Sequence, residues 1–156
     1  MNPIITGHHY QNAYIVRDID RAVEAFCAKA DVRLKMQTEV TQDLQLFGKP
    51  ATLSNKLAFL WVDDMQVELI EPSGGDDALY RDAMPSDDSM AFHHICFRVP
   101  DWESFRADAE RCGFPIALEG GSEALRYLYL DAREMLGHFI EYTWMNDERW
   151  GQLGGR

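Results

Sequence analysis

The chain has 156 residues, of which 46% are hydrophobic and 26% are charged, and its net charge is −11. This size and composition predict an ordinary soluble protein with one good core rather than a disordered chain. The negative charge argues against nucleic acid and anionic membranes as partners, because no basic cluster offsets it. The N-terminus lacks a signal-peptide pattern and no segment has the ~20 apolar residues that span a bilayer, so we expect a cytoplasmic protein.

The first part of the chain predicts a strand followed by a capped helix. Residues 8–16 read as a strand, and residues 19–30 carry apolar side chains at helical spacing. Asp18 stands where the N-cap of this helix belongs. Residues 32–40 return to an alternating pattern, which predicts a second strand.

The next stretch predicts a loop and then a hairpin. Residues 41–55 contain a glycine, a proline and scattered polar groups, which favour a loop or lid. Residues 57–62 are strongly apolar and predict a strand, and residues 65–71 are predicted to be its hairpin partner after a tight turn at Asp63 and Asp64.

A second copy of this pattern begins after residue 90. The sequence HICFRVPD at 94–101 matches QNAYIVRD at 11–18 with a constant offset of 83 residues. Such a long internal period indicates two duplicated modules rather than a solenoid. The second module is predicted to contain strand 91–99, helix 102–112 and strands 115–119, 125–131 and 138–144. Both halves therefore read β-α-β-β-β.

These patterns divide the chain into four parts within a single domain. Residues 1–72 form the first module and residues 91–145 the second. Residues 73–90 are rich in glycine and aspartate, which predicts a solvated acidic linker. Residues 146–156 are predicted to be a loosely docked tail. The three cysteines form no CxxC pair, so we expect no disulfide framework.

Four polar residues occupy equivalent positions in the two modules. Glu68 and Glu141 each lie among apolar neighbours in the last strand of a module, where a carboxylate is costly unless it is paired or bound to a metal. Gln11 and His94 lie in the two first strands. Two carboxylates, an amide oxygen and an imidazole suit a hard divalent cation. The alternative for each residue is an isolated polar side chain on a solvent-exposed sheet face.

The repeated modules, the segments QNAYIVRDID, HICFRVPDW and VELIEP, and the closing DAREMLGHFIEY resemble the vicinal-oxygen-chelate superfamily over nearly the whole chain. The resemblance implies an α+β fold in which two β-α-β-β-β modules pair into one curved mixed sheet around a metal site. It also implies that the chain binds one divalent metal ion, which could be Zn, Ni, Co, Mn or Mg. Its ligands would be Gln11, Glu68, His94 and Glu141, a set similar to that of eukaryotic-type glyoxalase I. Many relatives have His at the first position, so Gln11 leaves the identity of the metal open.

The function that follows from this resemblance is a metal-dependent isomerase or lyase, glyoxalase-like or epimerase-like. It would remove a proton next to a carbonyl and stabilise the enediolate on the metal. Glu141 is the expected base, and Glu68 could exchange roles with it. The alternatives are a non-enzymatic small-molecule-binding or resistance protein and, with Gln11 counting against it, an extradiol-type dioxygenase.

Other residues extend this prediction to the substrate. Tyr129, Arg133 and His138 are candidates for binding a small-molecule substrate, as an aromatic wall, a local positive charge and a turn histidine near the pocket. His93 lies on the opposite strand face from His94, which favours a structural role. His9 shares the strand parity of Gln11 and could replace it as a ligand. We expect a symmetric homodimer, because the sheets would leave edges and an apolar face to bury.

Overall fold

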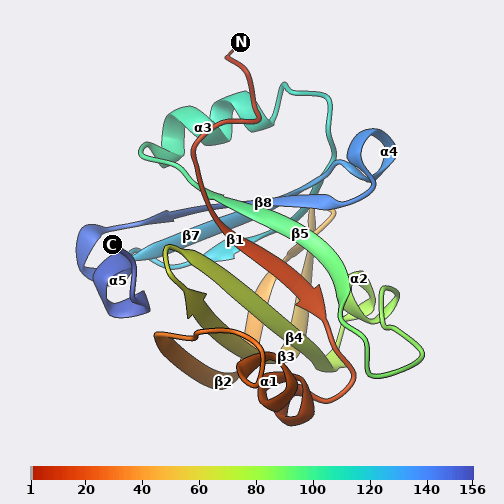
Figure 1. The fold of residues 1–156 in the computed structure, drawn as a ribbon. Helices are drawn as coiled ribbons and strands as arrows, with labels where there is room; N and C mark the ends of the chain where they lie inside the picture. Colours follow the sequence, from red (N-terminus) through yellow and green to blue (C-terminus); the bar gives the residue numbers. More distant parts are fainter. Residues whose placement is uncertain (1) are drawn as a thin grey trace. The chain divides into compact units, whose positions relative to one another are not determined.

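A computed structural model describes residues 2–156 and shows a mixed α+β chain with eight strands and five short helices among these residues (Figure 1). The order of the elements gives two β-α-β-β-β modules, so the predicted fold class is confirmed. The first module consists of β1 (His8–Ile15), α1 (Ile19–Cys27), β2 (Leu34–Leu46), β3 (Lys49–Val62) and β4 (Met65–Gly75). The second consists of β5 (Ala91–Arg98), α3 (Trp102–Ala109), β6 (Ile116–Gly121), β7 (Leu125–Asp131) and β8 (Phe139–Met145). The further helices are α2 (Ala78–Arg81), α4 (Arg133–Leu136) and α5 (Asp147–Leu153).

The chain packs into two compact units that follow the modules only in part. The N-terminal unit comprises Gln11–Asp43 and Ala51–His94. The C-terminal unit comprises residues 2–10, Leu44–Pro50 and Ile95–Arg156. Strands β1 and β5 therefore each begin in one unit and end in the other.

In the N-terminal unit, the strand order is β1-β4-β3-β2, with β1 and β4 parallel and β3 antiparallel to β4. Helix α1 packs its apolar side against Ala58, Leu60 and Leu69 on one face of this sheet. Side chains alternate along a strand, so Glu68, the neighbour of Leu69, faces the side of the sheet away from α1. Ala13 and Phe59 share that face because both lie opposite Glu68 in the register.

The C-terminal unit repeats this arrangement with the order β6-β7-β8-β5. Helix α3 packs Phe105 against Tyr142, with ring centroids 4.4 Å apart, and the cluster includes Ile140 and Leu128. The apolar neighbours of Glu141 thus face α3, and Glu141 itself faces the other side of the sheet. Each module therefore presents one glutamate on the face that its helix leaves uncovered.

Both module helices begin where the sequence predicts. The side chain of Asp18 accepts a hydrogen bond from the backbone N–H of Arg21 at 3.0 Å. The side chain of Asp101 does the same for Ser104 at 3.1 Å. An aspartate at this position satisfies a backbone donor that the first helical turn leaves without an intrahelical partner.

The prediction of a loop or lid over residues 41–55 is wrong, because these residues belong to the long strands β2 and β3. The two strands are joined at Phe47 and Gly48, which both have positive φ, 47° and 78°. Two successive residues with positive φ make the type of turn that matches the twist of a hairpin. Phenylalanine rarely adopts this conformation, so the sequence carries no familiar turn signal here.

The two segments outside the modules also contain helices. Strand β4 extends to Gly75, and α2 follows within the stretch predicted as a linker. The tail is not loosely docked: it forms α5, whose N-cap Asn146 accepts from Arg149, and it buries Trp150. The Trp150 ring meets the edge of Tyr10 at 4.9 Å, and the Arg98 guanidinium lies 4.5 Å from the Trp150 centroid.

None of the three cysteines forms a disulfide bond in the described part of the chain. Within residues 2–156, none of the helices combines the length and the apolar character needed to cross a membrane.

Candidate functional site

The four residues predicted to bind a metal are all buried. The exposed fraction of each residue is 3% for Gln11, 7% for Glu68, 0% for His94 and 9% for Glu141. The alternative that each is an isolated polar residue on a solvent-exposed sheet face is therefore wrong. Burial of two carboxylates and an imidazole is costly, so each of these side chains needs a compensating interaction.

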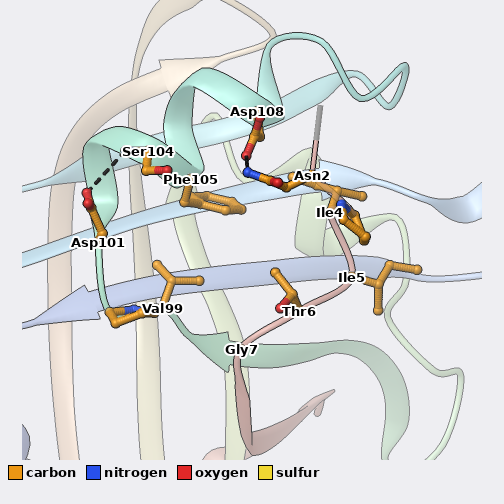
Figure 2. A pocket seen from close by; sticks show the side chains of 12 residues that line it. Asn2, Ile4, Ile5, Thr6, Gly7, Val99, Asp101, Ser104, Phe105 and Asp108 are labelled. Atoms are coloured by element: carbon orange, nitrogen blue, oxygen red, sulfur yellow. Dashed lines mark hydrogen bonds between the residues drawn. The ribbon is translucent and has the colours of Figure 1, made fainter.

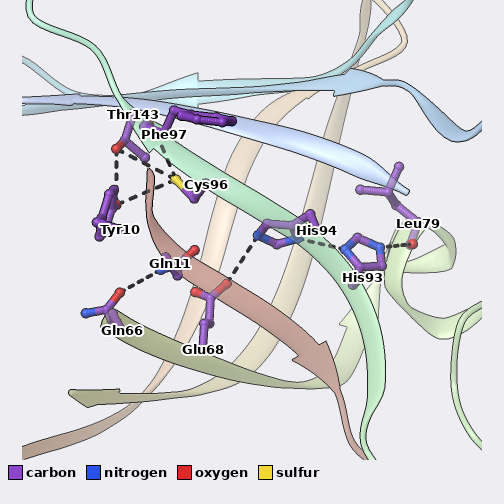
Figure 3. A network of polar contacts seen from close by, with 10 residues as sticks. All are labelled: Tyr10, Gln11, Gln66, Glu68, Leu79, His93, His94, Cys96, Phe97 and Thr143. Carbon is purple, nitrogen blue, oxygen red and sulfur yellow. Dashed lines mark hydrogen bonds and ion pairs between the residues drawn. The ribbon is translucent and has the colours of Figure 1, made fainter. Parts of the chain in front are cut away.

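In the N-terminal unit, Glu68 of β4 and His94 of β5 face each other. The Nε2 atom of His94 lies 3.6 Å from Oε1 of Glu68 (Figure 3). This separation is longer than a direct hydrogen bond, and it leaves the carboxylate oxygen and the imidazole nitrogen directed toward the same small region. Oxygen and nitrogen donors in this arrangement are the ones a divalent cation takes.

Gln11 of β1 lies in the same unit and is held by a second amide. Its Nε2 donates to Oε1 of Gln66 at 2.6 Å, because Gln11 and Gln66 are register partners in the parallel pair β1–β4. This bond orients the Gln11 amide so that its oxygen points away from Gln66 (Figure 3). Among residues 2–156, that buried oxygen accepts no hydrogen bond. A buried carbonyl oxygen without a donor is the atom a hard cation would satisfy, so the residues fit a metal.

His93 is bonded directly to His94, which the strand pattern does not predict. Its Nδ1 lies 2.8 Å from Nδ1 of His94, and its Nε2 lies 2.9 Å from the carbonyl oxygen of Leu79 at α2. Because side chains alternate along a strand, the Cα–Cβ bonds of His93 and His94 point to opposite sides of β5. Nδ1, however, is the ring nitrogen nearer to Cβ, so it stays close to the strand in both residues. The two rings can therefore turn their Nδ1 atoms toward each other past the backbone (Figure 3).

In the C-terminal unit, Glu141 of β8 lies directly opposite Tyr129 of β7. Burial raises the pKa of the Glu141 carboxyl to about 8, and a hydrogen bond with the Cys96 thiol acts in the opposite direction. Cys96 also lies 3.6 Å from the hydroxyl of Tyr10, which is 3.1 Å from the hydroxyl of Thr143. Burial, followed by the charges of Cys96 and Glu141, raises the pKa of Tyr10 well above its usual value. The Cys96 thiol is thus a hydrogen-bond partner of Glu141, and the Tyr10 and Thr143 hydroxyls lie next to that thiol.

Two further polar residues of these sheet faces are not among the predicted site residues. Gln66 shares the strand parity of Glu68 two residues upstream, so alternation alone could have found it. Tyr127 lies on the Glu141 face, and burial raises its pKa to about 12, with the charge of Glu141 contributing in the same direction. Its ring covers Gly120, where a Cβ atom would come within 2.5 Å of the phenol oxygen. No sequence signal indicates this contact between a glycine and a tyrosine.

The residues predicted to bind substrate lie in different surroundings. Tyr129 is buried on the face that carries Glu141. Arg133 is exposed, pairs with Asp131 at 2.7 Å and lies over the ring of Phe139 at 4.5 Å. His138 contacts the carbonyl oxygen of Phe139 at 2.7 Å through Nδ1. Their role in binding stays a prediction. His9, the substitute for Gln11, is exposed and lies 5.4 Å from the ring of Phe97.

A separate cavity of about 340 Å³ lies between the N-terminal segment and α3 in the C-terminal unit (Figure 2). Asn2, which lines this cavity, donates a hydrogen bond to Asp108, another lining residue, at 3.1 Å. None of the predicted site residues lines this cavity, so we do not assign it to the candidate site.

Comparisons with known proteins agree with this architecture. A methylmalonyl-CoA epimerase solved with methylmalonyl-CoA and NH4+ is 20% identical, with a TM-score of 0.64 over 90% of this chain and 96% of that one. A Streptomyces coelicolor methylmalonyl-CoA epimerase variant in complex with 2-nitronate-propionyl-CoA is 21% identical, with a TM-score of 0.64 over 90% and 96%. The Mycobacterium tuberculosis methylmalonyl-CoA epimerase is 16% identical, with a TM-score of 0.62 over 97% and 95%.

At these identities the likeness concerns the fold. No curated protein matches the sequence of this chain. The model of one protein family matches residues 10–128, which is well over half of the chain. The predicted resemblance is thereby confirmed, and the chain belongs to the glyoxalase/bleomycin resistance protein/dioxygenase superfamily.

Proposed function

We propose that this chain is a divalent-metal-dependent isomerase or lyase that removes a proton next to a carbonyl group, in the manner of an epimerase or a glyoxalase. In this proposal Gln11, Glu68, His94 and Glu141 hold the cation. Three of them, Glu68, His94 and Glu141, are buried side chains that each offer a ligand atom of the kind metal ions take in proteins. The fourth contributes the amide oxygen that accepts no hydrogen bond.

The observation that carries the proposal is the pair formed by Glu68 and His94. A carboxylate oxygen and an imidazole nitrogen only 3.6 Å apart in a buried position need positive charge or a proton between them. A divalent cation would meet that need, and the Gln11 oxygen in the same unit gives it a neutral ligand. Its charge would stabilise the oxyanion that develops on a substrate carbonyl as the proton leaves.

Glu141 is the residue we assign to proton transfer. A carboxyl with a pKa of about 8 in the absence of a cation would be brought toward neutrality by a nearby positive charge. A base whose pKa lies near the working pH transfers protons most efficiently. The hydrogen bond from Cys96 lowers this pKa less than burial raises it, so the carboxyl stays more basic than an exposed one. In this proposal Tyr129, the register partner of Glu141, contacts the substrate from the same face of the sheet.

The similar epimerase structures support a thioester as the first substrate to test, because their ligands are methylmalonyl-CoA and 2-nitronate-propionyl-CoA. In such a substrate the acidic hydrogen lies next to the thioester carbonyl. The reaction class and the substrate class are both part of the proposal. The intrachain origin of the ligands and the homodimer stay predictions.

The test is proton exchange. Metal-stripped protein is incubated in D₂O with methylmalonyl-CoA and, in turn, Mg, Mn, Co, Ni or Zn, and loss of the α-hydrogen signal is followed by NMR. We expect exchange that depends on at least one of these metals and stops with EDTA. Metal analysis of the active protein should give about one ion per chain, and His94→Ala should lose it. Metal binding without exchange of any carbonyl substrate would instead support a binding protein of the same fold.

A further inference from the structure

His93 is a buried side chain to which the proposed reaction gives no role. It is 4% exposed and uses both ring nitrogens: Nε2 contacts the Leu79 carbonyl oxygen at 2.9 Å, and Nδ1 contacts Nδ1 of His94 at 2.8 Å. Figure 3 shows the resulting row that runs from Leu79 through His93 and His94 to Glu68.

When both rings are neutral, the chemistry of these contacts decides where the protons lie. A carbonyl oxygen can only accept, so Nε2 of His93 must carry a proton. A neutral imidazole has one N–H, which leaves a lone pair on Nδ1 of His93. The 2.8 Å contact is then a hydrogen bond only if Nδ1 of His94 donates. With His94 also neutral, its Nε2 keeps a lone pair directed toward Glu68.

We propose that His93 is a positioning residue that holds His94 in the Nδ1–H tautomer and so makes Nε2 the ligand atom. The inference rests on the proposed function, because the group that the Nε2 lone pair would bind is the cation. Metal-bound histidines usually donate their second ring nitrogen to a carbonyl or carboxylate. Here a second histidine stands between the ligand and the carbonyl.

The carbonyl group of Leu79 lies in helix α2, and neighbouring residues of that helix hold it in position. Helix α2 is fixed by Arg81, whose guanidinium meets the Asp77 carboxylate at 2.6 Å and 3.1 Å and the Pro72 carbonyl at 3.2 Å. The ring of Tyr80 lies 5.2 Å from that of His93 at an angle of 30°. In this proposal the segment that contains α2 determines which nitrogen of His93 carries the proton. Through His93 it also determines which nitrogen of His94 carries the proton.

Two matched substitutions separate this role from simple packing. His93→Asn can place an amide oxygen near the position of Nδ1, so it keeps the acceptor for His94 and loses the contact with Leu79. His93→Gln can place an amide nitrogen near the position of Nε2, so it keeps the donor to Leu79 and loses the acceptor for His94. Both remove the ring, so any cost of lost packing is common to the two variants.

The first measurement is the tautomer of His94 in the metal-free full chain at pH 8, by long-range ¹H–¹⁵N correlation. We expect Nδ1–H in the unaltered protein and in His93→Asn, and a shift toward Nε2–H in His93→Gln. The second is the affinity for Zn²⁺ and Mn²⁺ by calorimetry, which we expect to fall about 10- to 100-fold for His93→Gln and less than about threefold for His93→Asn.

Nε2–H on His94 in the unaltered protein would overturn the inference without any variant. Equal metal affinity in the two variants would overturn it as well. Failure of the proposed function looks different: His94 would show the expected tautomer, but no metal would bind or no substrate proton would exchange. If the protein binds metal and exchanges the substrate proton, but His93→Gln leaves the His94 tautomer unchanged, the proposed function stands and the proposed role of His93 is wrong.

Discussion

Glu68 and Glu141 hold the same place in two copies of one module but have different neighbours. Each lies in the last strand of its module, on the face that the module helix leaves uncovered. Glu68 faces the imidazole of His94 at 3.6 Å. Glu141 instead has the Cys96 thiol beside it, and burial raises its pKa to about 8. In our proposal, the surroundings of these two equivalent carboxylates favour an anionic ligand in one and a proton acceptor in the other.

The difference can be traced to the first strand of each module. The offset of 83 residues relates Ala13 of β1 to Cys96 of β5. Ala13 lies opposite Glu68 in the β1–β4 register and offers it no polar group. Cys96 offers Glu141 a weak donor. The glutamate that we assign as a metal ligand, Glu68, thus lies opposite the methyl group of Ala13. The glutamate that we assign as the base, Glu141, lies beside the thiol of Cys96.

The largest expected effect comes from replacing each glutamate by its amide. Glu141→Gln should lower the rate of substrate proton exchange by about 10³-fold or more, because a general base contributes about 10²–10⁴-fold and a ligand charge is also lost. Glu68→Gln should act mainly on the metal, with an affinity about 10–100-fold weaker and exchange largely restored at saturating metal. Exchange rates measured against metal concentration distinguish the two.

The comparison would be contradicted if Glu68→Gln and Glu141→Gln responded to metal in the same way. If saturating metal restores Glu141→Gln as well as Glu68→Gln, both carboxylates are ligands only, and the base must be sought elsewhere. If both variants keep full metal occupancy, the assignment of the ligands is wrong.

The second prediction concerns the stability of the metal-free protein. The pKa of Glu141 is raised from 4.5 to about 8, so between these values the folded state binds more protons than the unfolded state. Stability should therefore fall as the pH rises, by up to about 4 kcal/mol between pH 5 and pH 8 from this group. Urea unfolding in EDTA should show this loss in the unaltered protein and not in Glu141→Gln. A parallel pH dependence in the two proteins would contradict the raised pKa.

Local sequence signals predict much of this fold correctly. The aspartates that cap α1 and α3, the apolar stripes of both helices and the alternation in β4 and β8 depend on neighbours in the chain, so each can be read from a few residues. The hairpin turn at Phe47 could not be predicted, since the hairpin is formed although its turn residue is unfavourable. The docking of helix α5 could not be predicted either, because Trp150 packs against Tyr10, far away in sequence.

The candidate site shows the same limit. The alternation of side chains along the strands predicts that Gln11, Glu68, His94 and Glu141 belong to one site. Their burial is consistent with this prediction. The contact between His93 and His94 depends on side-chain torsions and on the Leu79 carbonyl, so alternation indicates a structural role and misses the hydrogen bond. The basicity of Glu141 depends on burial by residues of other strands, which no local pattern contains.

A smaller effect is expected from the two helix caps, which test whether the modules respond alike. Asp18→Ala and Asp101→Ala each remove the acceptor for one backbone N–H of the first helical turn. Each should lower the free energy of unfolding by about 1 kcal/mol, as measured by urea denaturation. Glu24→Ala, an exposed change in α1 without a capping role, should cost less than about 0.5 kcal/mol. A cap variant no more costly than this control would show that its helix end is not stabilised by the aspartate.

The smallest effect is expected at Cys96, the residue that distinguishes the surroundings of the two glutamates. Its side chain is fully buried and contacts the Tyr10 and Thr143 hydroxyls at 3.6 Å and 3.8 Å. Cys96→Ser keeps a donor beside Glu141, so metal content should be unchanged and exchange should stay within about threefold of the unaltered protein. Cys96→Ala gives this position the side chain of Ala13 and removes the donor, so the pKa of Glu141 should rise further and the pH profile of exchange should move to higher pH. Exchange rates of both variants from pH 6 to 9, with metal analysis of each, check this. Complete inactivation of Cys96→Ser with its metal still bound would contradict the assignment and would indicate that the thiolate takes part in the chemistry.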